Sequence, residues 1–247
     1  MRFDVAREFA HCVKAVGGVV LDETLHRPLF PNADYWFPRD NVVAELKCLS
    51  ENLAAKSEFN ESLTTLHASW VKRGLVPPAT QIRTQINLRD LPIKCAREFI
   101  EPIKKRLEAS TIRKANRQIQ ETKRHFGATD AKGLLLLAND GNYMLPPTMM
   151  AHLLPRILSA QYSSINSVIY FSINEITTAP GVPTPALFWI DGVLPGRDAV
   201  SLEFRRSIRT EWMRHYSRLV PEPVYEFDGR STPDLIDNIQ FFKNGRK

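Results

Sequence analysis

The spacing of apolar and polar residues predicts a chain in which helices alternate with short strands. An apolar stripe predicts a first helix over Phe3–Ala15, and Val19–Leu21 then begins a strand that runs toward Asp22 and Glu23. The later predicted helices are Ser50–Arg73, capped by Ser50, then Lys94–Phe126, broken near Pro102, then Pro146–Ser159 and Ala199–Leu219. The later predicted strands are Gly133–Ala138, buried on both faces, Ser167–Ile173 and Pro185–Ile190. Leu75–Pro92 and roughly the last 20 residues are predicted to be irregular.

Two apolar segments joined by a polar turn differ from the other predicted strands because they contain charges. If Arg39 and Asp40 form the centre of the turn in Asn32–Leu49, Asp34 lies opposite Glu45. Lys47 follows Glu45 by two residues and therefore shares its face. Directly opposed residues have Cβ atoms about 5 Å apart, so the two carboxylates would repel each other without a cation between them. The alternative is an amphipathic hairpin whose charged face is solvated.

A divalent metal is the cation that suits two such carboxylates. Mg²⁺ prefers oxygen ligands, binds one or two carboxylates, and completes its coordination with water and substrate phosphate. Such a metal activates water and neutralises charge on a phosphoryl group. The ammonium of Lys47 could orient the attacking water or stabilise the negative charge that develops. The pattern therefore favours the cleavage of phosphodiester bonds.

The same stretch resembles the PD-(D/E)xK superfamily of nucleases. Asp34 matches the aspartate of the motif, and Ala44-Glu45-Leu46-Lys47 matches its second half, while Ala33 stands where the motif usually has proline. The resemblance implies that Asp34, Glu45 and the main-chain carbonyl of Leu46 bind Mg²⁺, with Mn²⁺ as a substitute. It assigns Lys47 to catalysis together with the two carboxylates.

The resemblance also implies a fold. We expect an α/β protein with a restriction-endonuclease-like αβββαβ core, in which helices flank a mixed central sheet. Residues 1–140 would form this core, with a helical insertion at about 50–126, and residues 141–247 would extend the same domain with further α/β elements. Some members of the superfamily add a polar residue from the first helix or from the helix before the last core strand. Glu8 and Gln118 are the candidates here, although Glu8 could equally be a solvated helix residue.

Charge is unevenly distributed along the chain. The formal net charge is +6, and ten Lys or Arg against four Asp or Glu lie between Lys94 and Phe126. A second basic stretch runs from Arg197 to Arg218. Clustered positive charge is typical of proteins that bind polyanions, but a solvated helix face with i,i+4 ion pairs has the same composition. The candidate nucleic-acid contacts are Lys104, Lys105, Arg106, Arg113, Lys114, Arg117, Lys123 and Arg124.

The amino-acid composition says more about the cellular compartment of the protein than about any reaction that it catalyses. The chain has 247 residues, 43% of them hydrophobic and 24% charged, as is typical of a soluble globular protein. Its three cysteines have no Cys-x-x-Cys spacing, which favours a reducing cytoplasm. The charged N-terminus lacks the apolar run of a signal peptide, and the longest aliphatic run, Leu134–Ala138, is too short to cross a membrane.

These observations favour a Mg²⁺-dependent nuclease that acts on DNA. Two alternatives remain open: a catalytically silent nucleic-acid-binding or assembly module of the same fold, and an unrelated α/β binding protein with a chance motif. RNA as the substrate, the strandedness and sequence of the substrate, and endo- or exonucleolytic cleavage also remain open. A homodimer, a partner motor protein, or a role in restriction or phage defence would follow only by analogy.

Overall fold

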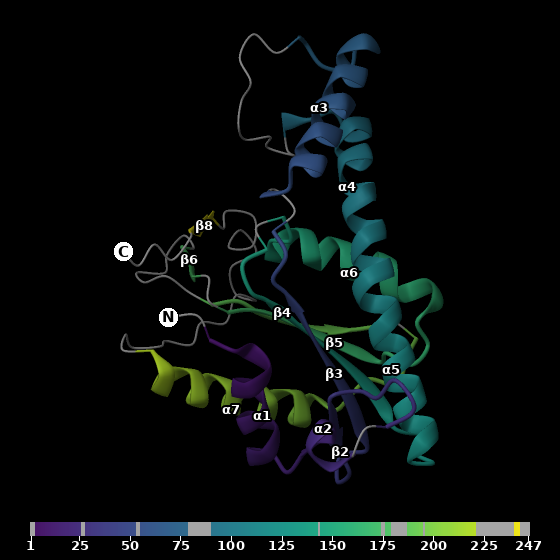
Figure 1. Cartoon of the computed structure of the whole chain (residues 1–247), viewed down its shortest axis with the longest axis vertical. Coiled ribbons are helices and arrows are strands. Elements are labelled where there is room, and N and C mark those ends of the chain that lie inside the picture. The colour runs from purple at the N-terminus through teal and green to yellow at the C-terminus, as the bar shows by residue number, and fades with distance from the viewer. Residues whose placement is uncertain are drawn as a thin grey trace.

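The computed structural model has an α/β architecture built on one six-stranded mixed sheet (Figure 1). It describes residues 3–242 apart from 26–27, 53–54, 79–89, 143, 174–175, 179–186, 195 and 221–239. The sheet has the order β1-β2-β3-β4-β5-β7. Its strands are β1 (Val19–Val20), β2 (Tyr35–Phe37), β3 (Val42–Leu49), β4 (Lys132–Asn139), β5 (Ser167–Ser172) and β7 (Trp189–Val193). A separate pair is formed by β6 (Ile176–Thr178) and β8 (Gln240–Phe242).

Strand direction changes across the sheet. The first three strands pair antiparallel, β3, β4 and β5 pair parallel, and β7 returns antiparallel to β5. Parallel neighbours need a crossover connection, which α4 and α5 supply between β3 and β4, and α6 supplies between β4 and β5. The predicted central run is confirmed, since Leu134–Leu137 are fully buried between helices on both faces.

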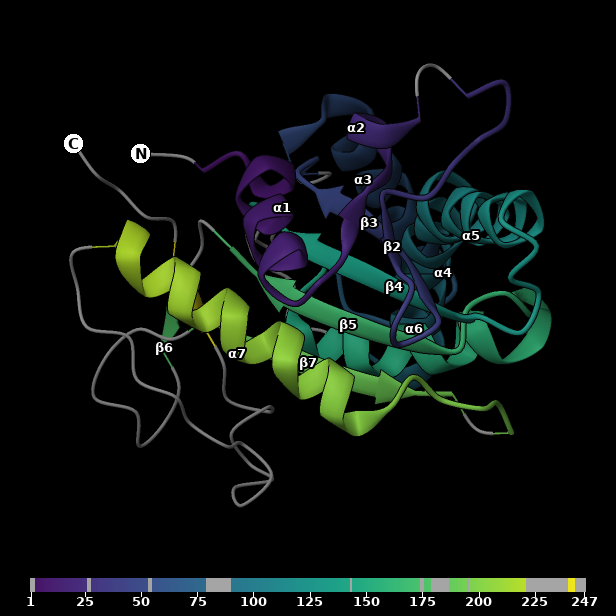
Figure 2. The same cartoon turned by 90° about the horizontal axis from the view of Figure 1, so that it is seen from below.

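Helices cover both faces of the sheet (Figure 2). One face carries α1 (Val5–Ala15) and α7 (Leu202–Leu219), where Phe9 stacks on Phe171 and packs against Trp212. The other face carries α4 (Ile93–Leu107), the π-helix Glu108–Ile112, α5 (Arg113–His125) and α6 (Pro147–Gln161). No helix in the described part of the chain is long and apolar enough to cross a membrane.

A helical arm projects from the carboxyl ends of β3 and β4 (Figure 1). It consists of α3 (Ser57–Lys72) and the first half of α4. The carboxylate of Glu98 fixes the two helices, because it accepts hydrogen bonds from the Trp70 indole at 2.8 Å and from both terminal nitrogens of Arg73 at 3.0 and 2.6 Å. Most of the segment Leu75–Pro92, which was predicted to be irregular, lies outside the described residues.

Several predicted boundaries are wrong. The strand at Val19 ends after two residues, because Leu25 N–H donates to Leu21 C=O and closes the one-turn helix α2 (Leu21–Thr24). Ser50 does not cap α3, because this helix begins only at Ser57. The strand expected at Pro185–Ile190 is β7, which begins four residues later. The irregular C-terminus lies mostly outside the described residues, but β8 falls within it.

The break expected at Pro102 is also wrong. Helix α4 continues through this proline. Pro102 is exposed, so the helical hydrogen bond that its missing N–H cannot make is lost on the side of the helix that faces solvent. The irregularity lies further along, at the π-helix Glu108–Ile112, which joins α4 to α5 without interrupting the helical path. Gly127 follows α5 with φ +64°, as expected for a glycine just past a helix end.

Candidate active site

The hairpin of β2 and β3 has the register that the sequence predicts. Phe37 pairs with Val42 and Trp36 pairs with Val43. Asp34 lies one residue before β2, and its N–H donates to Glu45 Oε2 at 3.1 Å. Its carboxylate Oδ2 accepts from Leu46 N–H at 2.7 Å. The structure therefore brings Asp34 and Glu45 together, as expected from a turn centred on Arg39 and Asp40.

Lys47 and Gln118 complete the cluster. The ammonium of Lys47 donates to Glu45 Oε1 and, at 2.8 Å, to the side-chain oxygen of Gln118 on α5. The amide nitrogen of Gln118 in turn donates to Asn32 C=O at 2.8 Å. The structure thus places Gln118 in contact with Lys47, and this glutamine connects the lysine to the loop that carries Asp34.

Helix α5 holds that loop at a second point, which the sequence analysis missed. The hydroxyl of Thr122, fully buried one helical turn beyond Gln118, accepts from Ala33 N–H at 2.7 Å. Asp34 is the next residue along the chain. The available signal was the i,i+4 spacing of Gln118 and Thr122, which puts both side chains on one side of a helix.

Burial sets the electrostatics of the carboxylate pair. Glu45 has no exposed surface. Burial raises the pKa of Glu45 to about 8, the negative charge of Asp34 contributes a smaller increase, and Lys47 opposes the shift. Burial also raises the pKa of Asp34, while the hydrogen bond from Leu46 and the charge of Lys47 lower it. Two carboxyl groups thus share one cation, and both have raised pKa values.

The residues present fit a divalent metal. The two carboxyl groups supply hard oxygen atoms, and a second positive charge would remove the repulsion that burial intensifies. Leu46 N–H points toward Asp34, and in an extended strand the C=O of the same residue faces the same neighbour. The carbonyl of Leu46 therefore lies on the side of Asp34. In the described part of the chain, no group of three or more His, Cys, Asp or Glu side chains could hold a metal, so water and substrate would have to complete the coordination.

The structure does not bring Glu8 to this cluster. Helix α1 packs on the opposite face of the sheet, and Glu8 Oε2 lies 2.8 Å from His215 Nε2 on α7. Asp22 of α2 lies nearer, since its carboxylate accepts from the Asn32 amide at 2.9 Å and its charge acts on Asp34. We therefore withdraw Glu8 as a supporting residue, and Asp22 is a further acidic neighbour of the site.

The predicted nucleic-acid contacts have different environments. Lys105, Arg113, Lys114 and Arg117 are exposed. Lys104, Arg106 and Arg124 have carboxylate partners, namely Glu101, Glu51 and Glu121. Lys123 is partly buried, its amine donates to Ser164 C=O at 3.1 Å, and burial lowers its pKa to about 8. The exposed group, together with the paired residues, remains the candidate surface, and Lys123 is explained by packing.

The second basic stretch is largely explained by the fold. The guanidinium of Arg197 donates to main-chain carbonyls at the end of α6, including Leu158 C=O at 2.7 Å. Arg205 is buried against Asp191 of β7. Arg214 pairs with Glu211 one turn earlier on α7. The fold therefore accounts for the charges of Arg197, Arg205 and Arg214, while Arg206 and Arg218 are exposed on α7.

No protein-family model, curated protein or solved structure matches this chain. The chemistry of the cluster therefore has to be inferred from its own residues.

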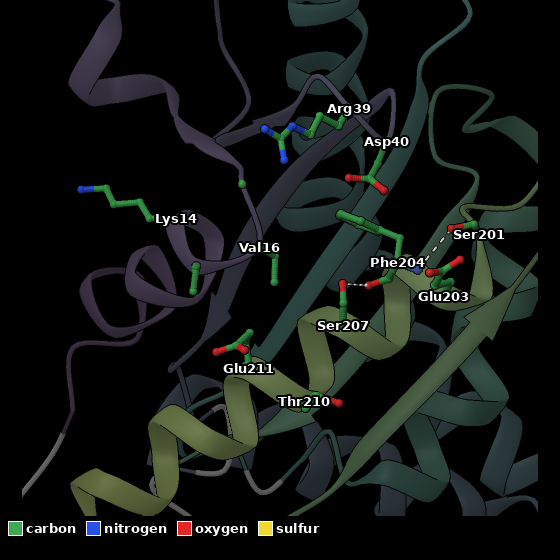
Figure 3. A pocket seen from close by; sticks show the side chains of 12 residues that line it. Lys14, Val16, Arg39, Asp40, Ser201, Glu203, Phe204, Ser207, Thr210 and Glu211 are labelled. Carbon is green, nitrogen blue, oxygen red and sulfur yellow. Dashed lines mark hydrogen bonds between the residues drawn. The ribbon is translucent and has the colours of Figure 1, made fainter.

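A hollow in the surface lies away from the carboxylate pair (Figure 3). It has a volume of about 710 Å³ and lies between the end of α1, the β2–β3 turn and the start of α7. Its lining includes two basic residues, Lys14 and Arg39, and three acidic ones, Asp40, Glu203 and Glu211, so its charges are mixed. Because these residues form no concentrated group of one charge, the hollow competes poorly with the carboxylate pair as a catalytic centre.

Proposed function

We propose that the protein is a metal-dependent nuclease that hydrolyses phosphodiester bonds, with DNA as its expected substrate. The observation that carries this proposal is the grouping of a fully buried carboxyl, Glu45, and a partly buried one, Asp34, with a single lysine, Lys47, as the cation that acts on both. Burying a carboxylate without full compensation is costly. A cluster with surplus negative charge is therefore expected where a metal is to be bound.

The arrangement of the core supports the same proposal. If the one-turn helix α2 and the inserted helices α3 and α4 are left aside, helix α1, strands β1 to β3, helix α5 and strand β4 have the αβββαβ order implied by the resemblance to PD-(D/E)xK nucleases. The two helices lie on opposite faces of the sheet. We infer that these elements form a restriction-endonuclease-like core, to which β5, α6, β7 and α7 are additions.

Each residue has a distinct role in this proposal. Asp34, Glu45 and the carbonyl of Leu46 would hold Mg²⁺ or Mn²⁺, which when bound lowers the pKa of water and neutralises charge on the phosphate. Lys47 orients the attacking water or stabilises the developing negative charge. Gln118 holds the ammonium of Lys47 through its side-chain oxygen.

Cleavage assays on plasmid, linear and single-stranded DNA, and on RNA, with Mg²⁺, Mn²⁺ or EDTA test the proposal. Asp34→Asn removes a charged ligand yet keeps an acceptor for Leu46 N–H, so cleavage and metal affinity should fall together. Lys47→Ala should slow cleavage by about 10²–10³-fold while metal binding largely survives. Lys14→Ala, which removes an exposed lysine paired with Glu23, is the matched control.

The outcomes separate the competing functions. Wild-type cleavage in both site variants would show that the hairpin is not the active site. Nucleic-acid binding without cleavage under every metal condition would favour a catalytically silent module of the same fold. Calorimetry of Mn²⁺ binding to the same variants distinguishes the loss of a metal ligand from the loss of the catalytic lysine.

A further inference from the structure

A small pocket with a mixed polar and apolar lining opens at the carboxyl end of β3, the strand that carries Glu45 and Lys47. Its volume is about 130 Å³, roughly four times the ~30 Å³ that a water molecule occupies in the liquid. It lies where β3 ends, since Cys48 and Leu49 line it and directly follow Lys47. A strand rises about 3.3 Å per residue, so the pocket begins within about 7 Å of Lys47 along β3.

The π-helix supplies hydroxyl groups to this pocket. Ser110 and Thr111 line it, with their oxygens 3.3 Å apart. Ser110 donates to Arg106 C=O at 2.7 Å, so its oxygen can still accept a hydrogen bond. Single π-turns inside α-helices are rare and are frequent at functional sites. The widened turn therefore presents polar groups beside the guanidinium of Arg106, which also lines the pocket.

One carboxylate already bridges two cations at this point. Glu51, which lines the pocket, pairs with Lys56 from the segment before α3 and with Arg106 of α4 at 2.6 Å. A hydrogen bond from Lys56, and a weaker contribution from a hydrogen bond with Arg106, hold the pKa of Glu51 below its ordinary value, so the carboxylate stays ionised. All three side chains are between 39% and 51% exposed. Ion pairs this exposed contribute little stability, so a stronger anion could displace the carboxylate.

We propose that this pocket binds a backbone phosphate of the nucleic-acid strand, close to the phosphate at the carboxylate pair, and that Glu51 occupies the position of that phosphate in the free protein. This inference rests on the proposed nuclease function. The fork of the Arg106 guanidinium matches two oxygens of a phosphate, as it does two oxygens of a carboxylate. Lys56 adds a point charge, and the hydroxyl of Thr111 is a suitable donor, whereas that of Ser110 is already donated to Arg106 C=O. The bound strand would therefore exchange one anion for another without leaving a cation unpaired.

Binding measured without metal tests the pocket apart from catalysis. Fluorescence anisotropy of labelled single- and double-stranded oligonucleotides would be recorded in EDTA over a series of salt concentrations. Arg106→Gln should weaken binding several-fold and lower the salt slope by about 1, because one phosphate contact is lost. Glu51→Gln should tighten binding by about two- to five-fold, because the competing carboxylate is neutralised. Arg106 and Glu51 are exposed, so both variants should fold.

The matched controls are Arg214→Gln and Glu211→Gln, which make the same charge changes in an ion pair on α7 at the opposite face of the sheet. If both pairs of variants changed the oligonucleotide affinity equally, net charge alone would explain the effect, and the proposed phosphate pocket would be ruled out. Inorganic phosphate that displaces the oligonucleotide from the wild type but not from Arg106→Gln would support the pocket as the phosphate site. Displacement from both proteins alike would overturn it.

Failure of the pocket differs from failure of the nuclease proposal. Metal-dependent cleavage by the wild type, with unchanged binding in the Glu51 and Arg106 variants, would overturn only the pocket. Shifted binding in these variants with no cleavage by the wild type would overturn the nuclease proposal and leave a phosphate-binding pocket.

Discussion

Two charge clusters are embedded in this protein, and their compositions differ. On α7, Arg205 is 8% exposed, pairs with Asp191 of β7, and donates from Nε to Val200 C=O at 3.0 Å. On β3, Glu45 is fully buried against Lys47, but Asp34 adds a second carboxylate to the same space. The first cluster has one negative and one positive charge. The second has two carboxyl groups for one ammonium.

The difference separates an ion pair whose charges balance from a cluster in which two carboxyl groups share one cation. A balanced pair leaves no group to be neutralised, so the contact of Arg205 with Asp191 simply connects α7 to the edge of the sheet. In the unbalanced cluster, burial and the neighbouring carboxylate raise the pKa of Glu45 to about 8. Glu45 therefore retains a proton to higher pH than an ordinary glutamate, and a bound metal would have to displace that proton.

The largest expected effect is a pH dependence of metal binding. Below the pKa of Glu45, about 8, metal binding has to release a proton, so Mn²⁺ affinity should rise about ten-fold per pH unit between about pH 6 and about pH 8. Isothermal titration in buffers of different ionisation enthalpy would detect the released proton. A flat affinity over this range would mean that Glu45 is already ionised, and the contrast between the clusters would disappear.

The stability of the metal-free protein should show the opposite trend. A carboxyl whose pKa is raised on folding contributes stability that is fully present below its unfolded pKa, near 4.5, and is lost as pH rises through its folded pKa, near 8. Urea unfolding in EDTA should therefore give a falling free energy over this window. Glu45→Gln, which cannot ionise, should reduce that dependence. An equal slope in the variant would place the titrating group elsewhere.

A smaller effect is expected from the balanced cluster. Arg205→Met keeps most of the side-chain volume but leaves Asp191 without its partner, and should lower the free energy of unfolding by about 2 kcal/mol. We reduce the value expected for a fully buried pair because Asp191 is 28% exposed. Chemical denaturation measures the loss. Mn²⁺ affinity should stay at the wild-type value, and a change in it would mean that the two clusters are coupled.

The smallest effect concerns the support of the unbalanced cluster. Thr122→Val keeps the shape of the side chain but removes the acceptor of Ala33 N–H, at a cost of about 1 kcal/mol. If this bond positions Asp34, Mn²⁺ affinity should also fall by a few fold, and Thr122→Ser should restore it. A stability loss without any change in metal affinity would make Thr122 a purely structural residue.

The sequence predicted the hairpin well because charges and turn together define a register. Only one pairing placed Asp34 opposite Glu45 with Lys47 on the same face, and a slip of one residue would have reversed every side chain. The long apolar run of β4 was equally informative, since strands of a parallel sheet buried on both faces lose the polar alternation.

Other features depend on tertiary packing. The pattern of α1 identified its buried stripe but not which face of the sheet it covers, so the sequence could not show that Glu8 lies near His215 of α7 and away from Asp34 and Glu45. The role of Thr122 depends on a main-chain N–H that is 89 residues away along the chain. The π-helix, by contrast, left a signal in the spacing of apolar residues. Buried positions recur every four residues to Leu107, and the next, Ile112, follows after five.

That step of five has a consequence for the geometry of the whole helix. Each residue advances an α-helix by about 100°, so one added residue resets the angular phase between α4 and α5. Upstream of the π-helix, Phe99 and Ile103 point into the core, and downstream Ala115 and Ile119 do so as well. Deleting one residue from Glu108–Ile112 would make the helix regular and rotate the arm about its own axis by about 100° relative to the sheet. The angular setting of the arm is therefore encoded by the length of a single turn and is independent of the residues that form the carboxylate pair.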